Sequence, residues 1–236
     1  MIPRIDQHNP DFPSTRRALR SPNGLLAIGG DLSLSRLLRA YERGIFPWYQ
    51  DPQPVLWWSP DPRTVLFPDE LKISRSLRKA MRNSEYRVSA DRDFRQVLAG
   101  CAAPRKKDTG SWITTAMRNA YTELHRAGYA HSVEVWNQDG DLVGGLYGVA
   151  LGQVFFGESM FSKESNASKM ALAATLRILA EKGYRMIDCQ VRSEHLVSLG
   201  ARDIPRLDFE KYLAQTVGMN RPTPRWSLEI AARELP

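Results

Sequence analysis

The sequence has little cysteine and no long apolar run. Cys101 and Cys189 are the only cysteines among 236 residues and form no CxxC pair, which argues against a disulfide framework and favours a reducing compartment. No apolar stretch approaches the roughly 20 residues that a membrane span requires. The first residues, MIPRIDQHNPDFP, are charged and interrupted by proline, which predicts no signal peptide. Together these absences predict a cytoplasmic protein without a membrane partner.

Sequence motifs of several enzyme classes are missing as well. The four histidines occur in no HExxH motif and no Cys/His pair, so no metal site is predicted. The glycines form neither GxGxxG nor GxxxxGKS, which argues against a dinucleotide-binding fold and a phosphate-binding loop. GESMF begins like the nucleophile elbow of a hydrolase but lacks the final glycine of GxSxG. We therefore expect neither a metal nor another cofactor.

Positive charge is in excess and is unevenly distributed. The chain has 33 Lys and Arg against 26 Asp and Glu, which favours an anionic partner such as nucleic acid; a merely solubilising surface is the alternative. Residues 63–107 alone carry twelve basic and five acidic residues, an excess of seven. Within them, a helix predicted from Ser74 to Asn83 turns Ile73, Leu77, Ala80 and Met81 to one side. The opposite side, named here the basic face, consists of Arg75, Arg78, Lys79 and Arg82.

The remaining pattern predicts an α+β fold in two domains. Residues 1–62 are rich in proline and glycine, contain one helix over about 33–43, and are read as a small N-terminal domain. Residues 63–236 are read as the larger domain. Its predicted elements are a helix over about 114–127, strands within 131–136, 142–151 and 152–159, a helix over 166–184 and a short strand over 185–191. This order predicts a mixed sheet.

An aromatic segment closes the N-terminal domain. Residues 44–63 hold Trp48, Trp57 and Trp58 among five prolines, so neither a long strand nor a helix is expected there. The rings either form the core of a small domain or stack on an unpaired base, a contact worth roughly 1–3 kcal/mol.

Polar residues that interrupt apolar strands mark a candidate site. Glu158 follows the apolar run VFF, and Asp188 and Gln190 follow Met186 and Ile187. In a regular strand Asp188 and Gln190 share one face while Cys189 takes the other, and a carboxylate beside an amide can orient an amine. The alternative is that these groups are a satisfied buried network, with Glu158 capping a turn or pairing with arginine.

Ten segments between Pro22 and Phe209 form one larger pattern. They are NGLLAIGGDLS (23–33), AYERGIFPWY (40–49), WWSPDPRTVLFP (57–68), LKISRSLRK (71–79), SWITTAM (111–117), AHSVEVW (130–136), LVGGLYG (142–148), FFGESMFS (155–162), NASKMAL (166–172) and IDCQ (187–190). Together these segments resemble the leucyl/phenylalanyl-tRNA–protein transferase family, with small departures at Tyr49 and Ser111. The resemblance implies an enzyme that moves Leu or Phe, and less readily Met, from aminoacyl-tRNA to the N-terminal Arg or Lys of a protein. The product is an N-degron that marks the protein for degradation.

The resemblance also implies a GNAT-like fold, that of the acyl-CoA N-acyltransferases, for the larger domain. SKESNASK stands where CoA-using GNAT enzymes have a glycine-rich pyrophosphate loop, which fits tRNA as the acyl donor. A monomer is expected. Two rival functions stay open on the residues: another GNAT-like aminoacyl transferase, such as one acting on cell-wall precursors, and a module that only binds tRNA or single strands.

Residue roles follow from the same resemblance. Asp188 and Gln190 are the expected catalytic pair: Gln190 bonds the attacking amine, and Asp188 orients it and balances the developing charge. Either Asp188 or the 2′-hydroxyl of the terminal adenosine handles the proton. An apolar pocket for the transferred side chain is predicted from Leu146, Met160, Leu172 and Ile187.

The expected tRNA contacts complete the prediction. Trp48 and Trp112 are predicted to hold the terminal adenine, with Phe155 and Glu158 near the ribose and the aminoacyl group. Tyr41 and Tyr121 are predicted to line the acceptor side. The basic face is predicted to contact acceptor-stem phosphates without reading sequence.

Overall fold

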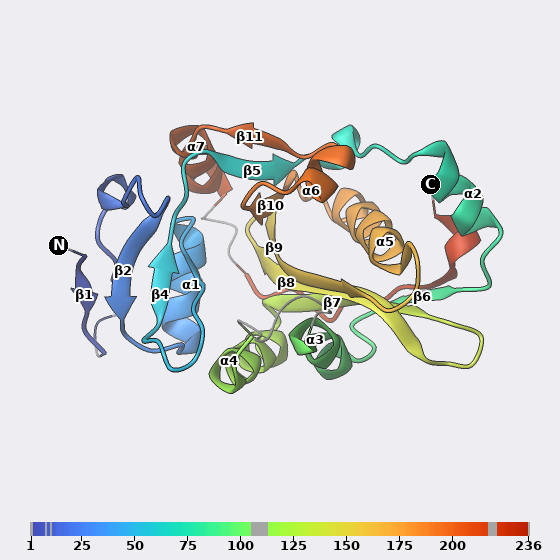
Figure 1. The fold of residues 1–236 in the computed structure, drawn as a ribbon, viewed down its shortest axis with the longest axis horizontal. Coiled ribbons are helices and arrows are strands. Elements are labelled where there is room, and N and C mark those ends of the chain that lie inside the picture. The colour runs from blue at the N-terminus through green and yellow to red at the C-terminus, as the bar shows by residue number, and fades with distance from the viewer. Residues whose placement is uncertain (1, 8, 10, 105–112, 217–220, 236) are drawn as a thin grey trace.

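The computed structural model describes residues 2–7, 9, 11–104, 113–216 and 221–235, which form a small and a large β-sheet (Figure 1). Helices cover both sheets, so the predicted α+β class with a mixed sheet is confirmed. None of the described helices is both long and apolar enough to cross a membrane.

The small sheet belongs to the N-terminal part of the chain. Its strands occur in the order β1-β2-β4-β3, with β1 parallel to β2 and the other pairs antiparallel. Their bounds are β1 (Arg4–Ile5), β2 (Leu25–Gly29), β3 (Phe46–Pro47) and β4 (Leu56–Trp58). Helix α1 (Leu34–Glu42) follows β2 and confirms the helix predicted here. Gly44, two residues after the end of α1, adopts φ +68°. A Cβ at this position would lie 2.7 Å from the ring of Phe209, so both the backbone and the space favour glycine.

The aromatic segment has two kinds of tryptophan. Trp57 is fully buried, meets Phe12 edge to face, and donates its ring N–H to the Gly29 carbonyl at 2.8 Å. Trp48 is 44% exposed, and its carbonyl accepts a hydrogen bond from the ring of Trp58 at 2.7 Å. The core interpretation therefore holds for Trp57, whereas Trp48 keeps a ring surface that another molecule can reach.

The large sheet has the strand order β11-β5-β10-β9-β8-β7-β6-β12. Its middle is the predicted meander of three antiparallel strands, β7 to β9, and β10 lies parallel to β9. The strands are β5 (Arg63–Leu66), β6 (Arg87–Ala90), β7 (Ala130–Trp136), β8 (Leu142–Leu151), β9 (Val154–Ser162), β10 (Met186–Gln190), β11 (Arg202–Ile204) and β12 (Glu229–Ala231).

Helices cover the large sheet on both faces (Figure 1). Helix α5 (Ala167–Glu181) joins β9 to β10 across one face, and α3 (Phe94–Ala102) and α4 (Thr115–Arg126) pack on the other. The helix α2 (Arg75–Arg82) lies at the end of the molecule far from β1, and α6 (Glu194–Ser198) and α7 (Arg206–Thr216) flank β11. Ser74 caps α2 by accepting a hydrogen bond from the Leu77 N–H at 3.1 Å.

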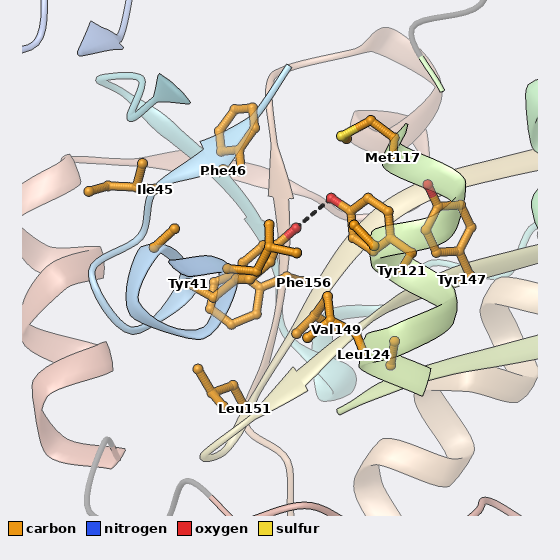
Figure 2. Packing of buried hydrophobic residues seen from close by; sticks show 14 of the residues in the cluster. Tyr41, Ile45, Phe46, Met117, Tyr121, Leu124, Tyr147, Val149, Leu151 and Phe156 are labelled. Carbon is orange, nitrogen blue, oxygen red and sulfur yellow. Dashed lines mark hydrogen bonds between the residues drawn. The ribbon is translucent and has the colours of Figure 1, made fainter. Parts of the chain in front are cut away.

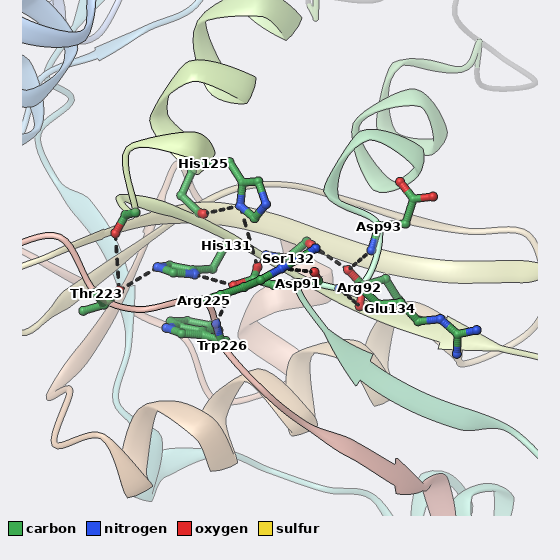
Figure 3. A network of polar contacts seen from close by, with 12 residues as sticks. Asp91, Arg92, Asp93, His125, His131, Ser132, Glu134, Thr223, Arg225 and Trp226 are labelled. Atoms are coloured by element: carbon green, nitrogen blue, oxygen red, sulfur yellow. Dashed lines mark hydrogen bonds and ion pairs between the residues drawn. The ribbon is translucent and has the colours of Figure 1, made fainter.

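A buried polar network attaches the last segment of the chain to the sheet (Figure 3). His131 on β7 bonds Asp91 at 2.7 Å through Nδ1 and Thr223 at 2.7 Å through Nε2. Its ring stacks on Trp226, and Asp91 also accepts the Trp226 backbone N–H. The same Asp91 accepts the N–H of Ser132, so its carboxylate is fully occupied in holding two chain segments together. These contacts give His131 a structural role, that of joining β7 to the last segment of the chain. In the part of the chain that is described, no group of three or more His, Cys, Asp and Glu side chains could hold a metal ion.

Candidate active site

A cavity of about 210 Å³ lies where β9 and β10 separate. The two strands pair only from Met186 opposite Val154 to Asp188 opposite Phe156, although β9 continues to Ser162. The cavity is lined by Leu146, Tyr147, Phe155, Gly157, Glu158, Ser159, Met160, Leu172, Ile187, Cys189, Gln190 and Leu196. The four side chains predicted to form an apolar pocket, together with Phe155, Glu158 and Gln190, are thus brought together by the fold. Their roles stay predictions.

Gln190 reaches this cavity because β10 is irregular at its end. The register with β5 shifts between Asp188 and Gln190, and Gln190 adopts φ +64°, a left-handed conformation that non-glycine residues seldom take. Its backbone N–H donates to Asp188 Oδ1 at 2.9 Å, and its side-chain Nε2 donates to Glu158 Oε1 at 2.9 Å. Gln190 and Cys189 therefore both line the cavity, and the strand alternation expected from the sequence does not hold here.

Asp188 does not line the cavity, and its side chain is fully buried. Its two oxygens accept the Nε and Nη2 of Arg63 at 2.7 and 2.6 Å, and both side chains are fully buried. Arg63 also donates to the Gly44 carbonyl at 2.9 Å and lies over the rings of Phe46 and Phe209. Asp188 therefore contacts the Gln190 backbone and its carboxylate faces Arg63, while the catalytic pairing of Asp188 with Gln190 stays a prediction.

Glu158 is the buried carboxyl group of the cavity. Tyr41 from α1 donates to its Oε1 at 2.8 Å and Tyr121 from α4 donates to its Oε2 at 2.6 Å. Figure 2 shows these two hydroxyls turned toward each other, 2.7 Å apart. Burial raises the pKa of Glu158 to about 7, aided by the negative charge of Asp188 and opposed by the hydrogen bonds from Tyr121, Tyr41 and Gln190. The carboxyl group therefore titrates near neutral pH.

The predicted donor and acceptor contacts lie in different places. Tyr41 and Tyr121 are fully buried behind Glu158 and do not line the cavity. Trp48 stands on the small sheet and does not line it either, while Trp112 lies outside the described residues. The basic face of α2 is exposed along its whole length, with Leu77 and Met81 buried on the other side as predicted. None of its residues lines the cavity.

Sequence reasoning missed several residues of this region. Tyr147, Ser159, Cys189 and Leu196 line the cavity, and the hydroxyl group of Tyr147 is buried with no hydrogen-bond partner in the described structure. A second cavity of about 800 Å³ shares Met160 and Leu196 with the first. Basic and hydroxyl groups of Lys163, His195 and Ser168 line it. The alternation in β8 and β9 gave a signal for Tyr147 and Ser159, but no motif pointed to Leu196.

Two family models match the chain. Residues 65–214 match the model described as leucyl/phenylalanyl-tRNA protein transferase, and residues 30–61 match the N-terminal domain model of the same description. A transferase of this name from Pseudomonas syringae pv. syringae (strain B728a) is 57% identical over 228 residues, covering 96% of this chain and 98% of the relative. The chain belongs to the leucyl/phenylalanyl-tRNA protein transferase family.

Other members of the family are equally similar. The transferase of Azotobacter vinelandii is 59% identical, covering 90% of this chain and 94% of the relative, and that of Pseudomonas putida is 59% identical at 91% and 95%. Among solved structures, L-PGS from Bacillus licheniformis aligns with a TM-score of 0.40 and 13% identity, over 73% of this chain and 57% of that one, a likeness too low to carry an argument. As a family member, the protein is an aminoacyltransferase whose substrates are aminoacyl-tRNA and protein.

Proposed function

We propose that the cavity between β9 and β10 holds the side chain of Leu or Phe while that residue is moved from tRNA to the N-terminal Arg or Lys of a protein. Met is transferred less readily, and the product is an N-degron that leads to degradation. The single observation that supports this most directly is an apolar cavity whose lining includes an amide and a carboxyl group, in a chain that belongs to this family.

The walls of the cavity fit an unbranched or aromatic side chain. Leu146, Leu172 and Ile187 are fixed by the buried core, and Met160 is the apolar wall residue with the most rotatable bonds. A flexible thioether can move to accept either Leu or Phe. A side chain that branches at Cβ has its extra methyl beside its own backbone, which this proposal places next to Glu158 and Gln190.

The proposed reaction is aminolysis of an ester by the acceptor's α-amino group. That group has a pKa near 8, so at neutral pH it must lose a proton before it attacks. The amide nitrogen of Gln190 is committed to Glu158, which leaves the amide oxygen to accept an N–H of the amine. Holding the amine against the ester carbonyl in this way supplies much of the rate enhancement through positioning.

Asp188 acts in this scheme through Gln190. Its oxygens are taken up by Arg63 and the Gln190 backbone N–H, and it has no contact with the cavity. It holds Gln190 in the left-handed conformation that turns the amide into the site. Of the two proton carriers considered from the sequence, this geometry favours the tRNA 2′-hydroxyl over Asp188.

The rest of the tRNA is proposed to lie on the exposed groups of the chain. The basic face of α2 contacts backbone phosphates, and the exposed ring of Trp48 stacks on the terminal adenine together with Trp112. Phe155 and Glu158 lie near the ribose and the aminoacyl group. The protein acts as a monomer in the cytoplasm, where aminoacyl-tRNA is found, and uses no cofactor.

The two parts of the chain are proposed to be a small N-terminal domain, residues 1–62, and a GNAT-like catalytic domain, residues 63–236. The separate small and large sheets support the division. Support for a GNAT-like domain comes from the mixed sheet, in which α5 crosses between the parallel strands β9 and β10. SKESNASK precedes α5 in place of a glycine-rich pyrophosphate loop.

A transfer assay tests the proposal. The protein is incubated with Leu-tRNA and a peptide that begins with Arg, and a matched peptide that begins with Gly is the control. We expect the Arg peptide alone to gain the mass of one leucyl residue. Unchanged masses of both peptides would reject the proposal and leave a binding module or an enzyme of another acceptor, such as a cell-wall precursor.

A further inference from the structure

Three polar groups beside the cavity form a closed ring, named here the carboxyl–tyrosine ring: the carboxyl group of Glu158 and the hydroxyls of Tyr41 and Tyr121. The three contacts measure 2.8 Å from Tyr41 to Glu158, 2.6 Å from Tyr121 to Glu158, and 2.7 Å between the two hydroxyls. All three residues are at least nine-tenths buried, so water does not replace any of these contacts.

The number of protons in this ring depends on the state of Glu158. Burial raises the pKa of Tyr41 and of Tyr121 well above the ordinary value, so each hydroxyl keeps its single proton. If Glu158 is ionised, both hydroxyls donate to it and the contact between the two tyrosines has no proton. If Glu158 carries a proton, three protons serve three contacts, and one oxygen still accepts from Gln190 Nε2. The neutral acid therefore supplies one proton for every contact of the ring, whereas the ionised acid leaves the contact between the two tyrosines without one.

We propose that Glu158 carries the third proton of this ring in the empty enzyme and takes the proton of the attacking amine during transfer. The proposal rests on the proposed function, since it assigns a step of the aminolysis. Glu158 lines the cavity beside Gln190, so an amine bonded to the Gln190 amide oxygen also lies at the carboxyl group. Tyr41 and Tyr121 are positioning residues that act through Glu158.

The charged and titratable groups around Glu158 agree with a shared proton. Tyr41 on α1, Tyr121 on α4 and Tyr147 on β8 face it as neutral hydroxyls. On β10 it faces Cys189, Gln190 and Asp188, and the charge of Asp188 is compensated by Arg63 on β5. No described cation bonds Glu158, so no fixed positive charge holds it ionised.

The step balances as follows. The acceptor enters as an ammonium ion, and its positive charge displaces the proton of Glu158 to solvent. The carboxylate then takes one proton from the ammonium. The neutral amine forms the bond to the ester carbon, and the bond from that carbon to the tRNA oxygen breaks. The tRNA oxygen receives the second amine proton, through the neighbouring 2′-hydroxyl, and Glu158 is again neutral. One proton is released to solvent in each turnover.

The pKa of Glu158 suits this step. Transfer from an ammonium ion with pKa near 8 to a carboxylate with pKa about 7 is unfavourable by roughly tenfold. The same transfer to an ordinary glutamate, with pKa about 4.3, is unfavourable by more than a thousandfold. The ring and its burial thus produce a much better proton acceptor than an exposed carboxylate.

The resting state is tested without substrate. In protein labelled with ¹³C at the glutamate carboxyl groups, the resonance of Glu158 is the one that the variant Glu158→Gln lacks. We expect it to show a neutral acid at about pH 6 and to titrate with a midpoint of about 7. A resonance that is already that of a carboxylate at about pH 6 would overturn the proposal. Because no tRNA is present, this result is independent of whether transfer occurs.

The role in transfer is tested by the dependence of kcat/KM on pH, with Leu-tRNA and an Arg-initiated peptide. The wild type should show a limb near pH 7 from Glu158 in addition to that of the amine near 8. Glu158→Gln should lower kcat/KM about 10²- to 10⁴-fold and remove the lower limb only. A Glu158→Gln variant with unchanged kcat/KM and limb would overturn the assignment, whereas no transfer by the wild type would refute the proposed function instead.

The ring is tested by the double variant Tyr41→Phe with Tyr121→Phe. It removes two hydrogen bonds to the carboxylate, which are stronger than those to the neutral acid, so the Glu158 midpoint should move to higher pH. The matched control is Tyr86→Phe, which removes a tyrosine hydroxyl that donates to a different glutamate, Glu164. A midpoint of Glu158 that is the same in the double variant and the control would contradict the ring.

Discussion

Asp188→Asn distinguishes a structural carboxylate from a catalytic one. Asp188 and Arg63 are both fully buried and joined by two hydrogen bonds of 2.7 and 2.6 Å. The substitution removes the negative charge and leaves the guanidinium buried without its counterion, a change that typically costs about 3–5 kcal/mol. For a chain of this length, each kcal/mol lowers the melting temperature by roughly 2–4 °C. We therefore expect a fall of roughly 6–20 °C.

The assay combines unfolding and transfer. Urea unfolding and thermal melting give the loss of stability, and transfer of Leu to an Arg-initiated peptide is measured well below the melting temperature. We expect reduced transfer, because asparagine keeps one acceptor oxygen where Asp188 has two, so the buried guanidinium of Arg63 and the Gln190 N–H compete for it. Asp203→Asn is the matched control, since this carboxylate on β11 is partly exposed and pairs with Arg192; its loss should stay within about 1 kcal/mol.

The double variant Arg63→Met with Asp188→Leu separates charge from position. It removes both buried charges, so it should regain much of the stability that Asp188→Asn loses. It should not regain transfer, because leucine has no acceptor for the Gln190 N–H. The reasoning is refuted if Asp188→Asn melts like the wild type yet loses transfer, since Asp188 would then act on the substrate directly.

Four further expectations follow from exposure, charge and shape. Trp48→Ala should weaken aminoacyl-tRNA binding with little change in melting temperature, because the ring is 44% exposed. The control Trp57→Ala, which removes a fully buried ring, should cost about 3–5 kcal/mol of stability. A Trp48→Ala variant that mainly unfolds would place the Trp48 ring in the core. Replacing the four residues of the basic face with glutamine should make tRNA binding less sensitive to salt. The slope of the log binding constant against log salt concentration should fall in magnitude by up to about 3–4, since each phosphate contact contributes about 0.9. An unchanged slope would reject these contacts. The free energy of unfolding of the wild type should fall by about 3 kcal/mol as pH rises from 4.5 to about 7, because Glu158 keeps its proton in the folded state and has lost it in the unfolded chain. Urea unfolding at several pH values measures this fall, which the Glu158→Gln variant should lack. In a competition between Leu-tRNA and Ile-tRNA, Leu should be transferred preferentially, and equal transfer would contradict the shape assigned to the cavity.

Local patterns in the sequence predicted the elements around the site well. The spacing of apolar and basic residues predicted α2, and alternation with tight turns predicted the meander from β7 to β9. These patterns are informative because side chains three or four positions apart share one face of a helix. Side chains two positions apart share one face of a strand. The helix α3 was overlooked, although Phe94, Val97, Leu98 and Cys101 have helical spacing after the capping residue Asp93.

Partners distant in the sequence were not predictable in the same way. The bond between Arg63 and Asp188 joins residues 125 positions apart, and that between Tyr41 and Glu158 joins residues 117 apart. A single sequence contains no periodicity over such separations. The position of Gln190 was also mispredicted, since alternation in a strand assumes regular backbone and the left-handed conformation of this residue breaks it.

The two predicted domains share one site. Tyr41 extends from α1 in the N-terminal part and donates to Glu158, and the Gly44 carbonyl accepts from Arg63, the partner of Asp188. The ring of Phe46 adds a cation–π contact to the same guanidinium. Both carboxyl groups near Gln190 therefore depend on residues before position 62. Since buried polar groups are costly when one partner is removed, the larger part alone would leave Glu158 and Arg63 with incomplete hydrogen bonds. The N-terminal part therefore contributes residues to the candidate site, and the predicted boundary at residue 62 does not separate these contacts.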